Sequence, residues 1–387
     1  MKILVITFSR GLNPGTFMQA LGVRTGLKKV FPEASIEYLN FPDFKRGFFG
    51  VRNDKDSVLS LARQKASALY RKIKYRKLEN KFFPQSARID LFDYDETFAK
   101  NLLNSYDLVA VGSDTILEEA YGASGKIGLN WLGRDVCQKP YFFFAASASP
   151  ANFELSDAVK NRLRENVEGA FFIGLRDLLT INFFEKKLGV ENALLIKQPD
   201  PTFFLDAKKF EVPVYYRRKI QKRKTVLYNF NAMFPYKREL AAMLQEKGYY
   251  VVTTGSCPGV NLCINTIDAT EWAGVFKYCD LVVTERFHDT IFALRNEKPV
   301  VTIDWAKHRF SENGDSKTFR ILEDSGMLDY HFHLKEKEDL RRIVDMIDDL
   351  KRSFKPENIR KRNAEFISLS ASLMDQVKDK FLEMGGK

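Results

Sequence analysis

The chain is predicted to be an α/β protein with two parallel sheets, each covered by helices on both faces. Short β-rich runs alternate with helical patterns along most of the sequence, as in KILVITF at 2–8 and YFFFAA at 141–146. Such alternation is typical of parallel strands joined by crossover helices. The pattern breaks at 207–224, a basic stretch without an apolar period, and then resumes. A chain of 387 residues also exceeds one ordinary core and suits two domains.

The first series is expected to form an N-terminal domain over residues 1–207. Thr16 and Gln19 have the spacing of a capping box, which predicts that Thr16 caps the first helix. That helix should run to about Val30. The strands expected in this half are 2–8, 35–39, 107–111, 141–146, 171–174 and 193–197, with further helices at 95–104, 156–168 and 177–188.

The second series is expected to form a C-terminal domain over residues 225–356, after a linker at 208–224. Its expected strands are 226–230, 249–254, 280–284 and 299–304, and its expected helices are 236–247, 270–278, 289–297, 317–326 and 337–352. A last helix at 357–383 would pack back across the first domain. Two such halves facing one another form a cleft, where ligands bind beyond the carboxyl ends of the strands.

Positive charge is concentrated in one insert. The chain carries a net charge of +11, and residues 43–90 hold thirteen Lys or Arg against five Asp or Glu. Within this insert, RQKASALYRKIKYRK at 63–77 is predicted to be a basic helix. Three interpretations stay open: a solvated helix face, a patch for anionic phospholipid or a lipid-diphosphate acceptor, and a nucleic-acid surface.

Several functional classes are disfavoured by the composition. The four cysteines have no C-x-x-C spacing and are expected to be reduced core thiols, so we expect no metal site. His331 and His333, which alternate, are expected to face solvent. No cofactor is expected, because the glycine-rich phosphate and dinucleotide signatures are missing. No apolar run approaches membrane-spanning length, and the start resembles a strand more than a signal peptide, so a cytoplasmic location is expected, with peripheral contact at the inner membrane face as an option.

The most informative motif is TERFHD, 284–289, which lies between a predicted strand and a predicted helix. Arg286 can bind phosphate or carboxylate with its planar guanidinium, and His288 can exchange a proton near neutral pH. The adjacent helix start also favours an anion. The structural alternative is a surface arginine beside a helix-capping histidine.

Other candidates follow predicted strands on the same edge. Arg176 in GLRD at 174–177 is placed to reach the ligand, or else to form an ion pair with Asp177 or another neighbour. Small polar residues also end three strands, as ligand-approached loops and ordinary tight turns both require. These candidates are Asn13, Gly15, Gly112, Ser113, Asp114 and Ser147.

Six motifs in order resemble the polysaccharide pyruvyl transferase family over roughly residues 1–330. They are Asn13-Pro-Gly15 with Gln19, Tyr106 to Asp114, Ala145 to Ser149, Gly174 to Asp177, Asp200-Pro-Thr202, and Arg286-Phe-His288 with the strand PVVTID. The resemblance implies two facing Rossmann-like domains of the GT-B type. It also implies transfer of pyruvate from phosphoenolpyruvate to two hydroxyls of a sugar, in a cell-surface polysaccharide or its lipid-linked precursor, forming a ketal.

The resemblance implies site roles as well. His288 and Arg286 would be catalytic, and Arg176 would bind the donor. The family lysine corresponds to Lys307 or, across a local insertion, to Lys317. Two departures are the Thr115-Ile-Leu117 sequence, where members often have Gln-Val-Trp, and this ambiguity of the lysine. The first leaves the acceptor open.

Two alternatives and one assignment remain open. A glycosyltransferase using a nucleotide-sugar donor would suit the same architecture, since fold does not settle chemistry. A non-catalytic surface-associated protein would depend on the basic segment. For the proton transfers we expect help from a carboxylate, with Asp114, Asp177 and Asp289 as unranked candidates.

Overall fold

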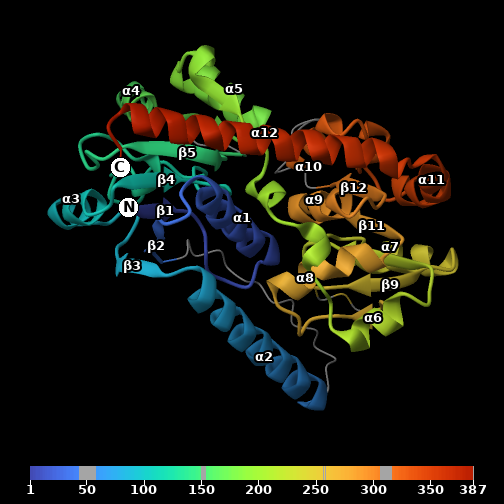
Figure 1. Ribbon diagram of the computed structural model, residues 1–387. Coiled ribbons are helices and arrows are strands. Elements are labelled where there is room, and N and C mark those ends of the chain that lie inside the picture. Colours follow the sequence, from blue (N-terminus) through green and yellow to red (C-terminus); the bar gives the residue numbers. More distant parts are fainter. Residues whose placement is uncertain (43–57, 150–153, 256, 258, 306–315, 387) are drawn as a thin grey trace.

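Figure 1 shows the computed structural model, in which two sheets lie side by side beneath one long helix. It describes residues 1–42, 58–149, 154–255, 257, 259–305 and 316–386. Both sheets are parallel throughout, so the predicted α/β architecture with two parallel sheets is confirmed. Lys307 and residues 43–57 of the expected insert lie outside the described residues.

The first sheet has the strand order β3-β2-β1-β4-β5-β6-β7. Its strands are β1 (Lys2–Ile6), β2 (Ser35–Asn40), β3 (Gln85–Arg88), β4 (Leu108–Val111), β5 (Tyr141–Ala146), β6 (Ile173–Leu175) and β7 (Leu195–Lys197). Every residue of β5 is buried, as expected for an inner parallel strand covered on both faces. The helices of this half are α1 (Pro14–Val30), α2 (Val58–Phe82), α3 (Glu96–Asn104), α4 (Asp157–Glu168) and α5 (Leu178–Phe183).

The second sheet has the order β10-β9-β8-β11-β12-β13, which repeats the connectivity of β3-β2-β1-β4-β5-β6 in the first sheet. Its strands are β8 (Thr225–Asn229), β9 (Tyr250–Thr253), β10 (Leu262–Cys263), β11 (Leu281–Thr284), β12 (Val300–Asp304) and β13 (His331–His333). The remaining helices are α6 (Val214–Ile220), α7 (Lys237–Glu246), α8 (Ala269–Val275), α9 (Phe287–Arg295), α10 (Lys317–Asp324), α11 (Asp339–Ser353) and α12 (Pro356–Glu383). In both sheets the strand order reverses direction beside the first strand, which is where such sheets bind ligands.

The first helix begins earlier than predicted. Its N-cap is Asn13, whose side chain accepts a hydrogen bond from the Gly15 amide at 3.1 Å, and Pro14 takes the first helical position. The predicted capping box is therefore wrong. Thr16 lies inside the first turn, and its hydroxyl is used for a tertiary contact. Proline at the first helical position starts the helix because its missing N–H has no helical partner there.

Glycine lets α1 approach the segment after β7 closely. A Cβ on Gly22 would lie 2.5 Å from the carbonyl carbon of Pro201, so no side chain fits there. This contact brings Gln19, three residues earlier, against Asp200.

Helix α12 runs along both halves in Figure 1. Near its start, Asn363 donates a hydrogen bond to the Leu294 carbonyl at 2.9 Å, at the end of α9. Near its end, the Phe381 ring packs edge-on against Phe31, with centroids 5.7 Å apart. One helix therefore ties the two sheets together.

Three local expectations differ from the structure. The segment expected as a linker, 208–224, contains α6, whose Ile220 is fully buried. Residues 85–88 of the expected insert form β3 at the edge of the first sheet. His331 is not solvent-facing: its side chain is 2% exposed and lies 3.3 Å from the Asp304 carboxylate.

Candidate functional site

The candidate residues gather where strands of both sheets end. In the first sheet, loops after β1, β4, β5, β6 and β7 supply Asn13, Asp114, Ser147, Arg176 and Asp200. In the second sheet, Arg286 and His288 follow β11, and Lys317 begins α10 after β12. Because all these strands are parallel within their sheets, their carboxyl ends lie on one edge of each sheet.

Asp200 is the residue on which the two halves meet. Its Oδ2 atom lies 3.3 Å from Nη1 of Arg176 and 3.6 Å from Nε2 of His288. The same oxygen accepts a hydrogen bond from Gln19 at 3.2 Å. The other oxygen, Oδ1, accepts from the amide and hydroxyl of Thr202 at 2.9 and 2.7 Å. One carboxylate thus holds an arginine of the first half and a histidine of the second.

The charge state of Asp200 follows from these contacts. Burial alone would raise its pKa, but His288, Arg176 and the Thr202 hydrogen bond together hold that pKa well below the ordinary value. Asp200 is therefore an anion at neutral pH.

Arg176 is buried rather than open to solvent. Its side chain is 3% exposed, and its Nε atom lies 3.9 Å from Asp177. The guanidinium also lies over the ring of Phe287, 4.7 Å from the centroid, which is a second contact between the halves. The alternative of an ion pair is thus realised, with Asp200 as the nearer carboxylate.

Asp114 is the second buried carboxylate of the site. Its Oδ2 accepts a hydrogen bond from the Thr16 hydroxyl at 2.9 Å, and its Oδ1 accepts from the Thr115 amide at 2.8 Å. Burial raises its pKa, but the charges of Arg176, His288 and Lys317 lower it by more, so the net shift is downward. These three basic groups therefore surround one carboxylate.

Gly15 leaves room for the His288 ring. A Cβ built on Gly15 would lie 2.7 Å from Cβ of His288 and closer still to Nδ1. The first turn of α1 thus lies directly against the imidazole. The N–H groups of a helix start carry partial positive charge, which favours an anion beside this histidine.

Ser147 holds the carboxylate of Asp177, the residue that follows Arg176. Its hydroxyl donates to Oδ2 of Asp177 at 2.8 Å, while Oδ1 of Asp177 caps α5 through the Thr180 amide at 2.8 Å. Gly112 has φ = +115° and a Cβ there would lie 3.1 Å from Ala146, so glycine is required where β4 meets the end of β5. Ser113 is fully buried beside it.

Arg286 differs from the charged candidates Asp114, Arg176, His288 and Lys317 because it is exposed. It occupies the N-cap position of α9, and its charge acts on two neighbours. Burial raises the pKa of Asp289 to about 6, against the opposing effect of Arg286. Burial lowers the pKa of Lys237, and the nearby charge of Arg286 lowers it further. Arg286 and Lys237 form a cationic pair on the second half.

Lys317 is a cation whose charge depends on pH in the range just above neutrality. Burial lowers its pKa to about 8, with a further lowering from Arg176 and opposing effects from Asp177 and Asp114. The residue itself is only partly buried. At neutral pH it is protonated, but its charge is lost in mildly alkaline solution.

Four buried polar atoms in this cluster have no hydrogen-bond partner among the described residues. They are Oε1 of Gln19, Oγ of Ser113, Nε of Arg176 and Nε2 of His288. Buried polar groups are nearly always satisfied in native proteins, so a concentration of exceptions at one place is characteristic of a ligand site. Three of the four can donate a hydrogen bond, which suits an anion.

Most residues singled out from the sequence are brought together here. Arg176, His288 and Lys317 lower the pKa of Asp114, Asn13 and Gly15 start the adjoining helix, and the Ser147 hydroxyl donates to Asp177. Lys307 lies outside the described residues. Two charged residues close to these groups were not among the sequence-derived site residues: Asp200, which contacts Arg176 and His288, and Lys237, which lies near Arg286. Asp200 belongs to the motif Asp200-Pro-Thr202 and follows a predicted strand, at the same edge of the sheet as the other candidates. That position could have identified it from the sequence.

The described residues contain no group of three His, Cys, Asp or Glu side chains that could hold a metal ion. None of the helices described is both long enough and apolar enough to cross a bilayer.

A family model described as "Polysaccharide pyruvyl transferase" matches residues 13–308 of this chain. No curated protein matches the sequence significantly. Among solved structures, the UDP-GlcNAc 2-epimerase from Neisseria meningitidis aligns with a TM-score of 0.55 at 10% identity, covering 99% of this chain and 100% of that one. The UDP-GlcNAc 2-epimerase from Methanocaldococcus jannaschii aligns with a TM-score of 0.51 at 12% identity, covering 98% and 99%. At such identities these structures show the fold alone.

Proposed function

The chain belongs to the polysaccharide pyruvyl transferase family, and we propose that it transfers pyruvate from phosphoenolpyruvate to two hydroxyls of one sugar. The family makes it a transferase acting on polysaccharide. The donor and the ketal product are the proposal. The acceptor would be a sugar of a cell-surface polysaccharide or of its lipid-linked precursor.

The observation that supports this proposal is the meeting of His288 with Arg176 and Asp200. A histidine from the second half lies 3.6 Å from a carboxylate that also binds an arginine of the first half. The imidazole of His288, which can exchange protons, thus lies close to the fixed positive charge of Arg176. Both groups are near the start of a helix. That combination suits a reaction in which an anion leaves as protons move.

Phosphoenolpyruvate is small and carries nearly three negative charges, so several cations must bind it. Arg286 is the exposed cation at the start of α9, and Lys317 is protonated at neutral pH. We propose that these two contact the donor directly. Arg176, whose side chain is 3% exposed, would add fixed positive charge and one free Nε–H from below.

We propose that one acceptor hydroxyl adds to C2 of the donor while the methylene carbon of the donor takes a proton and becomes methyl. The phosphate then leaves with the C2–O electron pair, and the second hydroxyl adds at C2 and closes the ketal. The two hydroxyls release two protons. One balances the proton that the methylene carbon takes up, and the other ends on phosphate or solvent.

His288 is placed to carry these protons. We propose that it acts as general acid and base, with Asp200 stabilising the imidazolium that forms. In that arrangement Asp200, rather than Asp114, Asp177 or Asp289, is the assisting carboxylate. Asp177 is occupied by Ser147 and the cap of α5, and Asp289 by Asn229 at 2.7 Å.

Steady-state kinetics test this proposal. Phosphate release is measured with phosphoenolpyruvate and a glycan fraction from cells lacking the gene, and mass spectrometry detects the ketal. His288→Ala should lower kcat by about 10²–10⁴-fold, while Arg286→Ala should mainly raise the donor KM. Lys361→Ala, an exposed change on α12, is the control. Unchanged rates in both site variants would reject the assignment.

Ligand binding separates this proposal from a nucleotide-sugar glycosyltransferase. The fold likeness to UDP-sugar epimerases bears on architecture only, and no observation favours a nucleotide sugar over phosphoenolpyruvate. Phosphoenolpyruvate should raise the thermal midpoint of the wild type and not of Arg286→Ala. Stabilisation by UDP-GlcNAc alone would favour the alternative.

A further inference from the structure

Helix α2 projects from the first half of the molecule, at the lower edge of Figure 1. It holds eight Lys or Arg and one Glu over Val58–Phe82. Its inner face is firmly attached. Tyr75 is 1% exposed, with its ring edge-on to Phe17 at 6.1 Å, and Arg71 donates to the Leu12 carbonyl at 2.9 Å. Lys74 pairs with Asp268 at 3.7 Å, next to α8.

The opposite side of α2 presents apolar residues to solvent. Leu69, Tyr70 and Ile73 are 61%, 55% and 47% exposed. At 100° per residue these three lie on one side of the helix and form a stripe over one turn. The same side is bordered by exposed basic residues. We call these eight residues the outer face of α2; its basic members are Lys65, Lys72, Arg76, Lys77 and Lys81.

This combination is unusual for a helix face that only meets water. A solvated face is normally polar, and single exposed apolar residues are scattered. Here the apolar stripe and the cations coincide, and the outer face carries no acidic residue. Helix α12 is the contrast: it also has exposed Ile367 and Leu369, yet its Pro356–Glu383 span holds five basic and five acidic residues.

We propose that the outer face of α2 docks on a membrane surface that contains anionic phospholipid. Amphipathic helices with basic flanks bind there because apolar side chains enter the headgroup boundary while cations pair with lipid phosphates. The long stems of Lys and Arg can lie along the apolar layer with their charges at the headgroups. Phospholipid is favoured over nucleic acid because phosphate contacts alone do not require the stripe of Leu69, Tyr70 and Ile73.

Docking in this way also orients the site. The inner face of α2 contacts the loop before α1: Arg71 binds the Leu12 carbonyl, and Glu79 accepts from the Gly11 amide at 3.0 Å. That loop leads directly to Asn13 and Gly15. A membrane under α2 would therefore lie beside the site and present a lipid-linked acceptor to it, a consequence that rests on the proposed function.

Vesicle co-sedimentation of the full chain tests the docking itself, without turnover. The wild type should bind vesicles of phosphatidylcholine mixed with phosphatidylglycerol, bind phosphatidylcholine alone weakly, and dissociate as salt rises. Lys72→Gln, Arg76→Gln and Lys77→Gln combined should lower the partition coefficient on the order of 100-fold, about 5-fold per charge. Leu69→Ser with Ile73→Ser should lower it by about tenfold.

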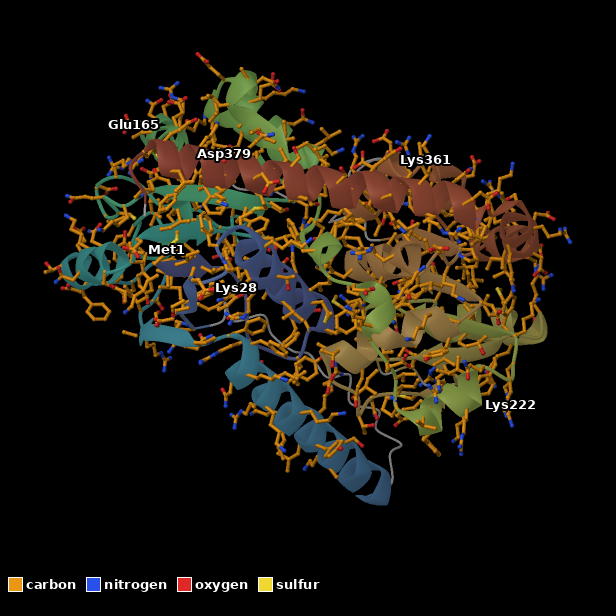
Figure 2. The ribbon with its side chains drawn as sticks, in the orientation of Figure 1. Met1, Lys28, Glu165, Lys222, Lys361 and Asp379 are labelled. Atoms are coloured by element: carbon orange, nitrogen blue, oxygen red, sulfur yellow. The ribbon has the colours of Figure 1, made fainter. Side chains whose placement is uncertain are left out.

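The matched control removes the same charge elsewhere. Lys361→Gln and Lys378→Gln lie on exposed positions of α12, and Lys355→Gln changes the exposed N-cap residue just before it. Figure 2 labels Lys361 on this helix, across the body from α2. This variant should bind vesicles within about twofold of the wild type, since charges beyond a Debye length are screened. All changed residues are exposed, so thermal midpoints should stay unchanged.

Three results would overturn the docking proposal. One is equal vesicle binding by the wild type and the α2 charge variant. Another is equal loss of binding in the α12 control, which would indicate net charge alone. The third is binding to duplex DNA that depends on the α2 cations, with no vesicle binding. Failure of pyruvyl transfer in the kinetic assay would leave vesicle binding intact, so the two proposals fail separately.

Discussion

Asp200 explains, at the scale of single residues, how the site is held. It is 2% exposed and is contacted by Gln19, Arg176, Thr202 and His288. Two of these are basic, so the carboxylate neutralises charge that would otherwise be costly to bury. It also fixes the side of the imidazole that carries Nε2.

We expect Asp200→Asn to lower both activity and stability. The amide keeps the shape, but among the described residues it leaves Asp177, at 3.9 Å, as the carboxylate within ion-pair distance of buried Arg176. The free energy of unfolding should therefore fall by about 3 kcal/mol. Denaturant unfolding measures this. Asp206→Asn, an exposed change six residues on, should cost under about 0.5 kcal/mol. Equal losses in the two variants would contradict the role of Asp200.

Gly15→Ala tests the contact between α1 and His288. The new Cβ would collide with the imidazole, so the ring must move. We expect kcat to fall by about tenfold or more, because displacement of a proton-transferring group by about 1 Å is costly. Gly255→Ala is the control, since its Cβ would meet only Thr253 Oγ1 at 3.7 Å. Wild-type kcat in Gly15→Ala would show that the ring position is unimportant.

The lowered pKa of Lys317 predicts that donor binding depends on pH. Its pKa of about 8 means that the cation is lost as pH rises through 8. If the charged form binds the donor, the donor KM should rise by about tenfold per pH unit above that value. Lys317→Arg keeps its charge, so its KM should stay flat to higher pH. Identical pH profiles for both proteins would exclude Lys317 as the titrating group.

The start of α9 shows how elements position the second half of the site. Oδ2 of Asp289 accepts hydrogen bonds from Asn229, at the end of β8, and from Thr284, at the end of β11, at 2.7 and 3.3 Å. Asn229 in turn accepts from the Thr254 amide after β9 at 3.0 Å. Three strand ends are therefore joined to the helix that carries His288, and its ring is placed by that network.

This network predicts a pH effect on stability. The pKa of Asp289 is raised from 3.8 to about 6 in the folded state. Protonation of Asp289 therefore stabilises the folded state relative to the unfolded state. This contribution to the free energy of unfolding is fully present below pH 4 and is lost as pH rises through 6. Asp289→Asn removes the dependence, so its stability relative to wild type should increase between pH 4 and 7 by about 2–3 kcal/mol. The exposed Asp329→Asn should show no such trend, which urea unfolding at several pH values would check.

Elements with strong patterns were predictable to within a few residues, but the start of α1 was not. Strands such as YFFFAA and helices such as α4 lie within about two residues of the expected bounds. The capping box failed because Thr16 and Gln19 have the right spacing yet bond to Asp114 and Asp200, both distant in sequence. Spacing along a chain cannot reveal such tertiary partners.

At the scale of the whole molecule, α12 joins the halves that form the site. It contacts α9 through Asn363 and reaches Phe31, after α1, through Phe381. Both partner helices contribute to the contact between Gly15 and His288. We propose that α12 keeps this contact in register.

Neighbouring residues at the end of α12 test that proposal. Phe381 is 2% exposed, and Phe381→Ala should lower the free energy of unfolding by about 3–5 kcal/mol. Leu382→Ala, at a residue 49% exposed, should change it by under about 0.5 kcal/mol. Thermal or denaturant melts distinguish them. Similar melts for the two variants would show that the helix end does not bind the first half.

The sequence by itself determined the α/β architecture, the family and the motifs of the site. Those follow from hydrophobic periodicity and from short segments whose chemistry is local. Only the tertiary structure decided that Arg176 is buried against Asp200 while Arg286 is exposed. It also decided that the His288 ring packs against Gly15, where a Cβ would collide with it. The reason is physical: burial and charge pairing depend on residues far apart in the chain, and a pattern of neighbours carries no information about them.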